Sequence, residues 1–205
     1  MQLRKYSAIV FDLGNVLIPF DYGIAIKRLN RFEKGLGDRF IEFYKSNYDF
    51  HREFERGKTT EKDFISKMLK VIDHKIDEET FCRNYADIFF LDKDVIALLP
   101  QLKYNYKLFL LSNTDSIHKK YGWGSYNFLK HFNELILSFE VGSVKPEEKI
   151  YRTVEKVSGI PSEEHFFIDD IQEYVDAAKN IGWDAVQFVD YQKLISDLKG
   201  RNILK

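Results

Sequence analysis

The chain has little cysteine and no excess of either charge, and each shortage excludes a class of protein. A single cysteine, Cys82, rules out an internal disulfide and a Cys-rich metal site, so we expect it to be a small core or boundary residue. The 31 basic and 32 acidic residues give a net charge of −1. Because no strong electrostatic field results, we expect neither nucleic acid nor an anionic membrane as a partner.

Long hydrophobic runs are also missing. No segment approaches the roughly 18 apolar residues that a membrane-spanning helix needs. The apolar stretch after residues 1–5 is broken by Asp12, unlike the apolar region of a secretory leader. We therefore expect a soluble cytoplasmic protein, either a monomer or a homodimer.

What the chain does contain is ample apolar material, at 44% of its 205 residues, and this is arranged in alternating patterns. Five short runs rich in Val, Ile, Leu and Phe are typical of parallel strands buried on both faces. They are residues 7–11, 106–111, 135–141, 165–168 and 184–189. Between the later runs, one predicted helix starts at Lys145-Pro146 and ends at Gly159, and another spans Ile171 to Ile181 before Gly182. This alternation predicts an α/β fold with a doubly wound, Rossmann-like parallel sheet.

Residues 20–95 break this alternation and show only helical patterns. Thr60 with Asp63 forms a capping-box-like helix start, and Asp77 begins a further helix. The aromatic stripes between them are typical of helices that pack on one another. We predict an all-helical cap domain at residues 20–95, inserted after the first strand of a core domain made of residues 1–19 and 96–205.

Polar side chains follow four of the predicted elements. Asp12 follows the first strand, Ser112-Asn113 the second, Lys145 the loop after the third, and Asp169-Asp170 the fourth. Each has an ordinary alternative explanation as a turn residue, a helix cap or a solvated lysine. Together, at the carboxyl ends of parallel strands, they suit phosphoryl transfer: a carboxylate attacks phosphorus, while a hydroxyl, an ammonium and Mg²⁺ hold the phosphate oxygens.

The order of these residues resembles that in the haloacid dehalogenase superfamily. "FDLGNVL", "LLSNTD", "VGSVKP" and "FIDD" with the following "DAAKNIGW" match its four motifs in sequence. The resemblance covers essentially the whole chain, including a helical cap, and is greatest to the branch that holds sugar-1-phosphate phosphatases. It implies a Mg²⁺-dependent phosphatase that hydrolyses a small phosphomonoester, such as a sugar phosphate, through an aspartyl-phosphate.

The resemblance also implies a role for each residue. Asp12 would be the nucleophile and a metal ligand, Ser112 would hold a phosphate oxygen with Asn113 beside it, and Lys145 would neutralise the phosphate. Asp170, Asp169 and the backbone carbonyl of Gly14 would complete the metal site. Many relatives carry Asp or Asn where this chain has Tyr174, so Glu173 is a further metal-ligand candidate, with an exposed helix residue as the alternative.

Gly14 departs from the family pattern, because most of its phosphatases place there the Asp that protonates the leaving group. Such help is worth about 10²–10⁴ in rate. One explanation is that Asp21, Asp115 or His118 replaces it, or that the leaving group needs little help. A second is a 2-haloacid dehalogenase, which Gly14 and the acidic pair oppose. A third is a weakly catalytic or non-catalytic relative that binds a ligand or partner.

Two further segments have open roles. His51 and Arg56 precede Gly57 in the predicted cap and could face the substrate, although for His51 we expect a plain helix-surface position. In residues 118–132, Tyr121, Trp123 and Tyr126 are expected to line the entrance to the site, to form a dimer contact or simply to pack.

Overall fold

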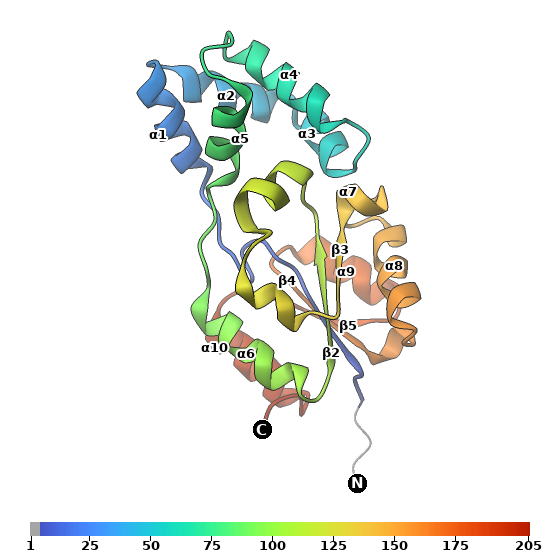
Figure 1. The fold of residues 1–205 in the computed structure, drawn as a ribbon. Coiled ribbons are helices and arrows are strands. Elements are labelled where there is room, and N and C mark those ends of the chain that lie inside the picture. Colours follow the sequence, from blue (N-terminus) through green and yellow to red (C-terminus); the bar gives the residue numbers. More distant parts are fainter. Residues whose placement is uncertain (1–4) are drawn as a thin grey trace.

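The computed structural model describes residues 5–205 and contains one five-stranded parallel sheet (Figure 1). Residues 1–4, which include part of the segment considered as a leader, lie outside the described residues. The strand order is β3-β2-β1-β4-β5. The strands are β1 (Ala8–Phe11), β2 (Lys107–Ser112), β3 (Glu134–Leu137), β4 (His165–Asp169) and β5 (Asp184–Gln187). The predicted doubly wound α/β core is confirmed.

Alternate residues of the central strand enter two different cores. Ile9 and Phe11 pack with α6 (Lys93–Lys103) and α10 (Tyr191–Gly200) on one face of the sheet. Ala8 and Val10 pack with α8 (Glu148–Ser158) and α9 (Gln172–Asn180) on the other. Because both faces are covered by helices, the strands consist of continuous apolar runs rather than alternating ones.

Two predicted boundaries are wrong by three or more residues. The third strand ends at Leu137 rather than at residue 141, because the buried Ser138 hydroxyl bonds both the backbone N–H and the carbonyl of Thr114, and a short helix, α7 (Ser138–Val141), follows. Gly142 ends α7 with a left-handed φ of 69°. The next helix begins at Glu148 rather than at Lys145-Pro146, which lies in the preceding loop with a cis peptide bond.

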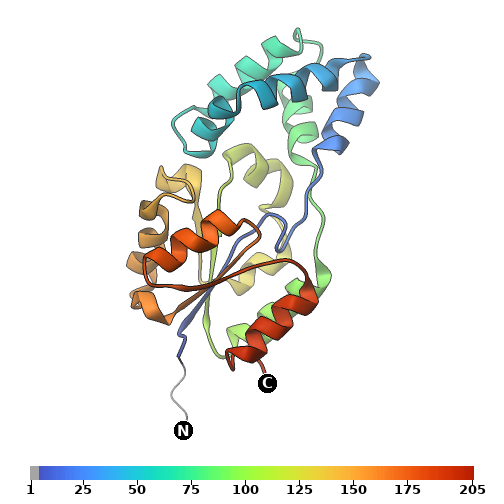
Figure 2. The same cartoon turned by 180° about the vertical axis from the view of Figure 1, so that it is seen from behind.

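Five helices between β1 and α6 stand over one end of the sheet, opposite the C-terminus (Figures 1 and 2). These cap helices are α1 (Tyr22–Phe32), α2 (Leu36–Ser46), α3 (Tyr48–Glu55), α4 (Glu61–Val71) and α5 (Glu78–Ala86). They enclose a separate hydrophobic cluster, to which Ile117 also belongs and to which Cys82 contributes as predicted. Thr60 and Asp77 cap α4 and α5 through their side-chain oxygens, also as predicted. A domain boundary at residues 20 and 95 stays a prediction.

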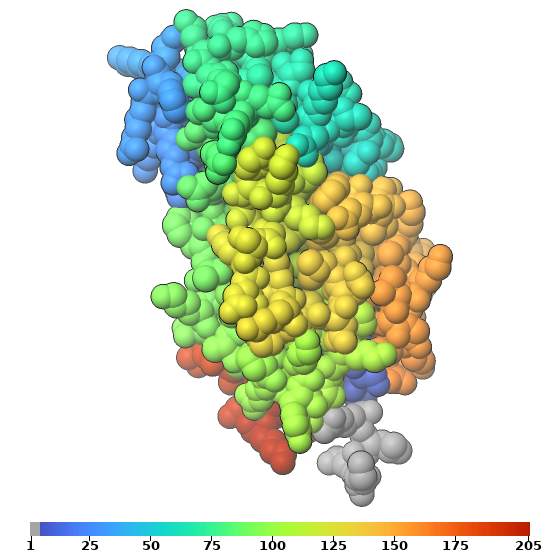
Figure 3. All heavy atoms as spheres, viewed as in Figure 1, coloured from blue at the N-terminus to red at the C-terminus, as the bar shows by residue number. Residues whose placement is uncertain are grey.

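The segment between β2 and β3 connects the cap helices to the core. It contains the π-helix η1 (His118–Trp123) and the 3₁₀ helix η2 (Asn127–His131). Figure 3 shows this segment, in yellow, covering the front of the molecule between the two parts, and η1 packs against α5. The 3₁₀ helix η3 (Ser162–Glu164) precedes β4. Among the described residues, no helix has the length and apolarity to cross a bilayer.

Candidate active site

The carboxyl ends of β1, β2 and β4 bring the predicted side chains together. The register of the sheet places Asp12, after β1, beside Asp169 at the end of β4. Ser112 ends β2 on the other side of β1. Lys145 reaches the same place from the loop before α8, with its Nζ 2.7 Å from Asp12 Oδ1 and 2.5 Å from Asp169 Oδ2. The residues of four separate motifs thus meet at one edge of the sheet.

Three carboxylates form a compact cluster at this edge. Asp12, Asp169 and Asp170 offer oxygen atoms that lie within 4.8 Å of one another. Burial raises the pKa of Asp12 to about 8; Lys145 opposes this rise, while Asp169 and Asp170 add to it. Burial also raises the pKa of Asp170, against a 3.1 Å hydrogen bond from the Asn15 amide. Three carboxylates facing one ammonium leave negative charge unbalanced, so this all-oxygen donor set fits a hard divalent cation.

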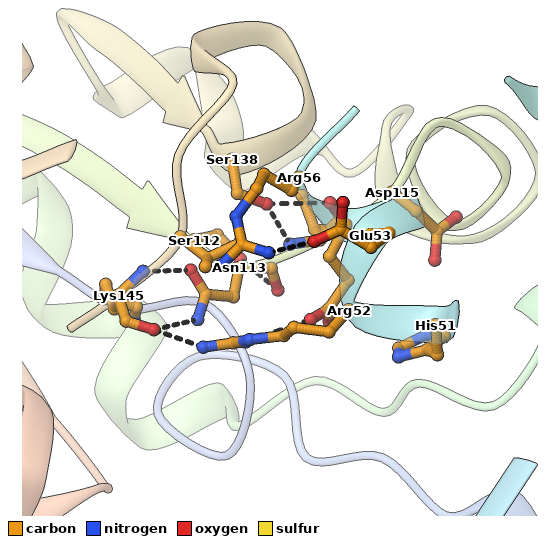
Figure 4. A network of polar contacts seen from close by, with 12 residues as sticks. His51, Arg52, Glu53, Arg56, Ser112, Asn113, Asp115, Ser138 and Lys145 are labelled. Atoms are coloured by element: carbon orange, nitrogen blue, oxygen red, sulfur yellow. Dashed lines mark hydrogen bonds and ion pairs between the residues drawn. The ribbon is translucent and has the colours of Figure 1, made fainter. Parts of the chain in front are cut away.

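Lys145 is buried, and its surroundings keep it charged. Burial alone lowers the pKa of Lys145, but the carboxylates of Asp12 and Asp169 outweigh that effect and raise it. The side-chain amide of Asn113 fixes the lysine backbone: it accepts from the Lys145 N–H at 2.7 Å and donates to the Lys145 carbonyl at 3.1 Å (Figure 4). Asn113, expected to contact substrate, therefore has its amide committed to positioning Lys145.

A cap-helix arginine crosses to the same loop. Arg52 of α3 donates to the Lys145 carbonyl and, at 3.2 Å, to the Tyr174 hydroxyl, as Figure 4 shows for the first contact. Its guanidinium also pairs with Glu55 at 3.0 Å. Arg52 also lines a cavity of about 200 Å³, whose wall contains Asp12, Ser112 and Lys145. The cap helices supply the opposite wall, from Tyr22, Tyr44, Tyr48, His51, Arg52 and Glu55.

Comparison with known families decides the classification. The family model described as haloacid dehalogenase-like hydrolase matches residues 6–182, which include the first three motifs, the fourth up to Gly182, and all the carboxylates above. The chain belongs to the haloacid dehalogenase-like hydrolase family. The family resemblance inferred from the sequence is confirmed.

Named relatives agree with this classification. D-ribitol-5-phosphate phosphatase from Bacteroides thetaiotaomicron is 24% identical over 187 residues, covering 87% of this chain and 90% of the relative. The crystal structure of a family enzyme from the same organism, in a magnesium complex, matches with a TM-score of 0.80 at 23% identity, covering 94% of this chain and 99% of that one. L-2-haloacid dehalogenase from Xanthobacter autotrophicus matches with a TM-score of 0.64 at 20% identity, covering 98% and 85%.

The position two residues after Asp12 is closed by an aromatic ring. A Cβ atom at Gly14 would lie 3.2 Å from Cε1 of Phe20, tighter than an ordinary contact. Phe20 in turn packs against Phe89, whose ring meets that of His118 edge-on at 5.2 Å. In this haloacid dehalogenase-like chain, the glycine therefore leaves room for Phe20, where most family phosphatases carry an acid.

The structure separates the candidates for replacing that acid. Asp21 is exposed and caps α1 through a 2.7 Å bond from the Gly23 N–H. Asp115 is fully buried and outside the cavity wall, whereas His118 is in the wall. Glu173 is exposed on the first turn of α9 and belongs neither to the carboxylate cluster nor to the cavity wall among the described residues.

The surface position expected for His51 is wrong. His51 is buried, with Nε2 3.1 Å from the Tyr85 hydroxyl and Nδ1 3.3 Å from the Tyr44 hydroxyl. These two partners, from α5 and α2, make burial of an imidazole acceptable. Of the aromatic segment, Trp123 lines the cavity, while Tyr121 and Tyr126 pack against the hydrophobic clusters.

Sequence reasoning missed Arg52, Tyr174 as a hydroxyl partner, and Asn15. Arg52 and Tyr174 meet only because α3 docks against the α8–α9 side of the core, which no local pattern encodes. Asn15 had a usable signal: it stands in a Leu-Gly-Asn turn and adopts a positive φ of 54°, a conformation that Asn tolerates better than most residues.

Proposed function

We propose that this hydrolase is a Mg²⁺-dependent phosphatase acting on a small phosphomonoester, with a sugar or polyol phosphate as substrate. The observation that carries the proposal is the position of Lys145, whose ammonium joins Asp12 to Asp169 at the meeting point of the strand ends. The magnesium and phosphatase assignments of the Bacteroides proteins support it. The substrate would be a small phosphorylated metabolite.

In the proposed reaction, a carboxylate oxygen of Asp12 attacks phosphorus, and the bond to the leaving alcohol breaks. The alcohol takes up a proton, and an aspartyl-phosphate remains on Asp12. Attack of water on its phosphorus then releases inorganic phosphate and restores the carboxylate. Lys145 and the Ser112 hydroxyl would hold the phosphate oxygens, with Asn113 keeping Lys145 in place.

Asp12, Asp170, Asp169 and the Gly14 carbonyl would hold Mg²⁺, which when bound would neutralise the phosphate oxygens and favour the ionised form of Asp12. Glu173, being exposed outside the cluster, could contribute through water. The cap helices would exclude bulk water and contact the leaving group.

The test is a panel of phosphate esters assayed with and without Mg²⁺. We expect the wild type to release phosphate from at least one ester only with Mg²⁺, and Asp12→Asn to release none above background. Asp176→Asn, an exposed acid on α9, serves as the matched control and should behave like the wild type. Activity retained in Asp12→Asn would refute the proposal, and dehalogenation of a 2-haloacid without Mg²⁺ would favour the dehalogenase alternative.

A further inference from the structure

Two residues of the cavity wall each contain a buried polar atom that has no hydrogen-bond partner. Among the described residues, three buried side-chain atoms are unpaired in this way, and two of them are His118 Nε2 and Trp123 Nε1. Both residues line the cavity and both belong to the π-helix η1. Buried polar groups without a partner are costly and rare in proteins. Because π-helical turns are also frequent at functional sites, we expect a ligand that can pair with these two atoms.

The His118 ring is held in a fixed orientation. Its Nδ1 lies 2.9 Å from Asp115 Oδ2, and the ring stacks on Tyr85 with centroids 4.2 Å apart. Asp115 is itself fixed, because it accepts from the Tyr85 hydroxyl and from the backbone N–H groups of Ile117 and His118, each at 2.9 Å. Asp115 lies outside the cavity wall, so Nδ1 is committed to a partner that does not line the cavity, and Nε2 is the ring nitrogen left to pair with a ligand.

The charges around this cavity favour a neutral group next to the phosphate. Both cationic side chains of lysine or arginine in the wall are already paired, Lys145 with Asp12 and Asp169, and Arg52 with Glu55. A second phosphate or a carboxylate on the substrate would therefore meet no spare cation there. The remaining cap-side wall is largely aromatic, which suits the C–H face of a polyol.

We propose that His118 and Trp123 hydrogen-bond hydroxyl groups of the leaving alcohol and so select polyhydroxylated monophosphates over plain alkyl phosphates. This inference rests on the proposed phosphatase function. Trp123 is fully buried and neither nitrogen is open to solvent, so binding requires a small movement of the cavity wall. Trp123 Nε1 then donates to one hydroxyl oxygen and His118 Nε2 pairs with another, which gives both unpaired atoms a partner. An alkyl chain in the same place leaves both unpaired, which is the situation that gives strong discrimination.

The experiment compares D-ribitol 5-phosphate with n-pentyl phosphate, which has the same carbon-chain length and no free hydroxyl groups. The measured quantity is the ratio of kcat/KM for the two esters. We expect the wild type to prefer D-ribitol 5-phosphate, and His118→Phe and Trp123→Phe each to lower the ratio by about tenfold to a hundredfold. Phe at position 118 keeps the ring contacts, and Asp115 keeps its Tyr85 and backbone donors.

His165→Phe is the matched control, since His165 is also buried and stacked, on Trp183, but lies at the opposite end of β4 from the site. It should leave the ratio unchanged. A parallel loss for both esters in His118→Phe would indicate proton transfer or support of the fold and would overturn the inference, as would an unchanged ratio. Equal wild-type rates for both esters would overturn it while leaving the phosphatase standing; hydrolysis of no phosphate ester at all would remove the proposed function itself.

Discussion

Asp170 is the member of the carboxylate cluster whose charge is least compensated. Lys145 contacts Asp12 and Asp169, whereas the side chain that donates to Asp170 is the neutral amide of Asn15. Its pKa is raised by burial and by Asp169, so the folded protein holds this carboxylate at a cost. A bound divalent cation would pair with this carboxylate and so stabilise the folded protein.

We therefore expect Mg²⁺ to stabilise the wild type, by up to about 2.7 kcal/mol at a hundredfold excess over Kd. In Asp170→Asn, Mg²⁺ should raise the free energy of unfolding very little. Without metal, this variant should be at least as stable as the wild type, because the substitution removes a charge that repels Asp12 and Asp169. Denaturant unfolding in Mg²⁺ and in EDTA measures the free energy of unfolding with and without metal. In the control Asp176→Asn, Mg²⁺ should raise this free energy as much as in the wild type. An equal Mg²⁺ gain in Asp170→Asn would show that the ion binds elsewhere.

At this scale, the sequence predicts the residues whose position depends on strand ends. Asp12, Ser112 and Asp169 follow apolar runs that form adjacent parallel strands, so the sheet register alone brings them together. The burial of His51 was not predictable, because it depends on hydroxyl partners from two other helices. The same holds for His118 and Trp123, because no local pattern shows that their ring nitrogens are buried without a hydrogen-bond partner.

Helix α3 is one of the elements through which the cap helices contact the core. Arg52 and Arg56 lie one turn apart on this helix or at its end, and both reach the core. Arg52 bonds the Lys145 carbonyl and Tyr174 at the cavity, whereas Arg56 pairs with the partly exposed Glu147 at the rim. The two arginines therefore offer a matched pair of variants.

We expect Arg52→Ala to raise KM about tenfold, since hydrogen bonds from a charged group are each worth about 1.5–3 kcal/mol and their loss loosens the cap over the site. Arg56→Ala should change KM less than about twofold, because exposed ion pairs contribute little. Steady-state kinetics on the best ester of the panel measures both. A larger rise in KM for Arg56→Ala than for Arg52→Ala would contradict this expectation and would show that the Arg56–Glu147 contact matters more for substrate binding.

Elements were predictable where local signals specify their ends. Thr60, Asp77 and Gly159 mark helix ends through side-chain capping or a left-handed backbone, and the structure bears out each. The start of α8 was misplaced because Asn113 and the carboxylates hold Lys145 in the loop, a tertiary effect. No sequence pattern predicted that η1 would be a π-helix.

At the scale of the whole molecule, the alternation of apolar runs and helical patterns, broken at residues 20–95, was sufficient to predict an α/β core carrying a helical insertion. The docking of that insertion was not predictable, since it depends on scattered contacts such as Ser116 with Glu61 and Arg52 with Tyr174. The cap-side wall of the cavity near Asp12 therefore depends on how the helical insertion packs on the core.

The central claim is that Asp12 becomes phosphorylated during turnover. The most direct measurement is mass spectrometry of wild-type protein quenched in acid during turnover of the best ester with Mg²⁺, followed by proteolysis to locate any modification. We predict one added phosphoryl group on the peptide that contains Asp12, absent without Mg²⁺ and absent in Asp12→Asn. Turnover with no such adduct, or an adduct at another residue, would contradict the account.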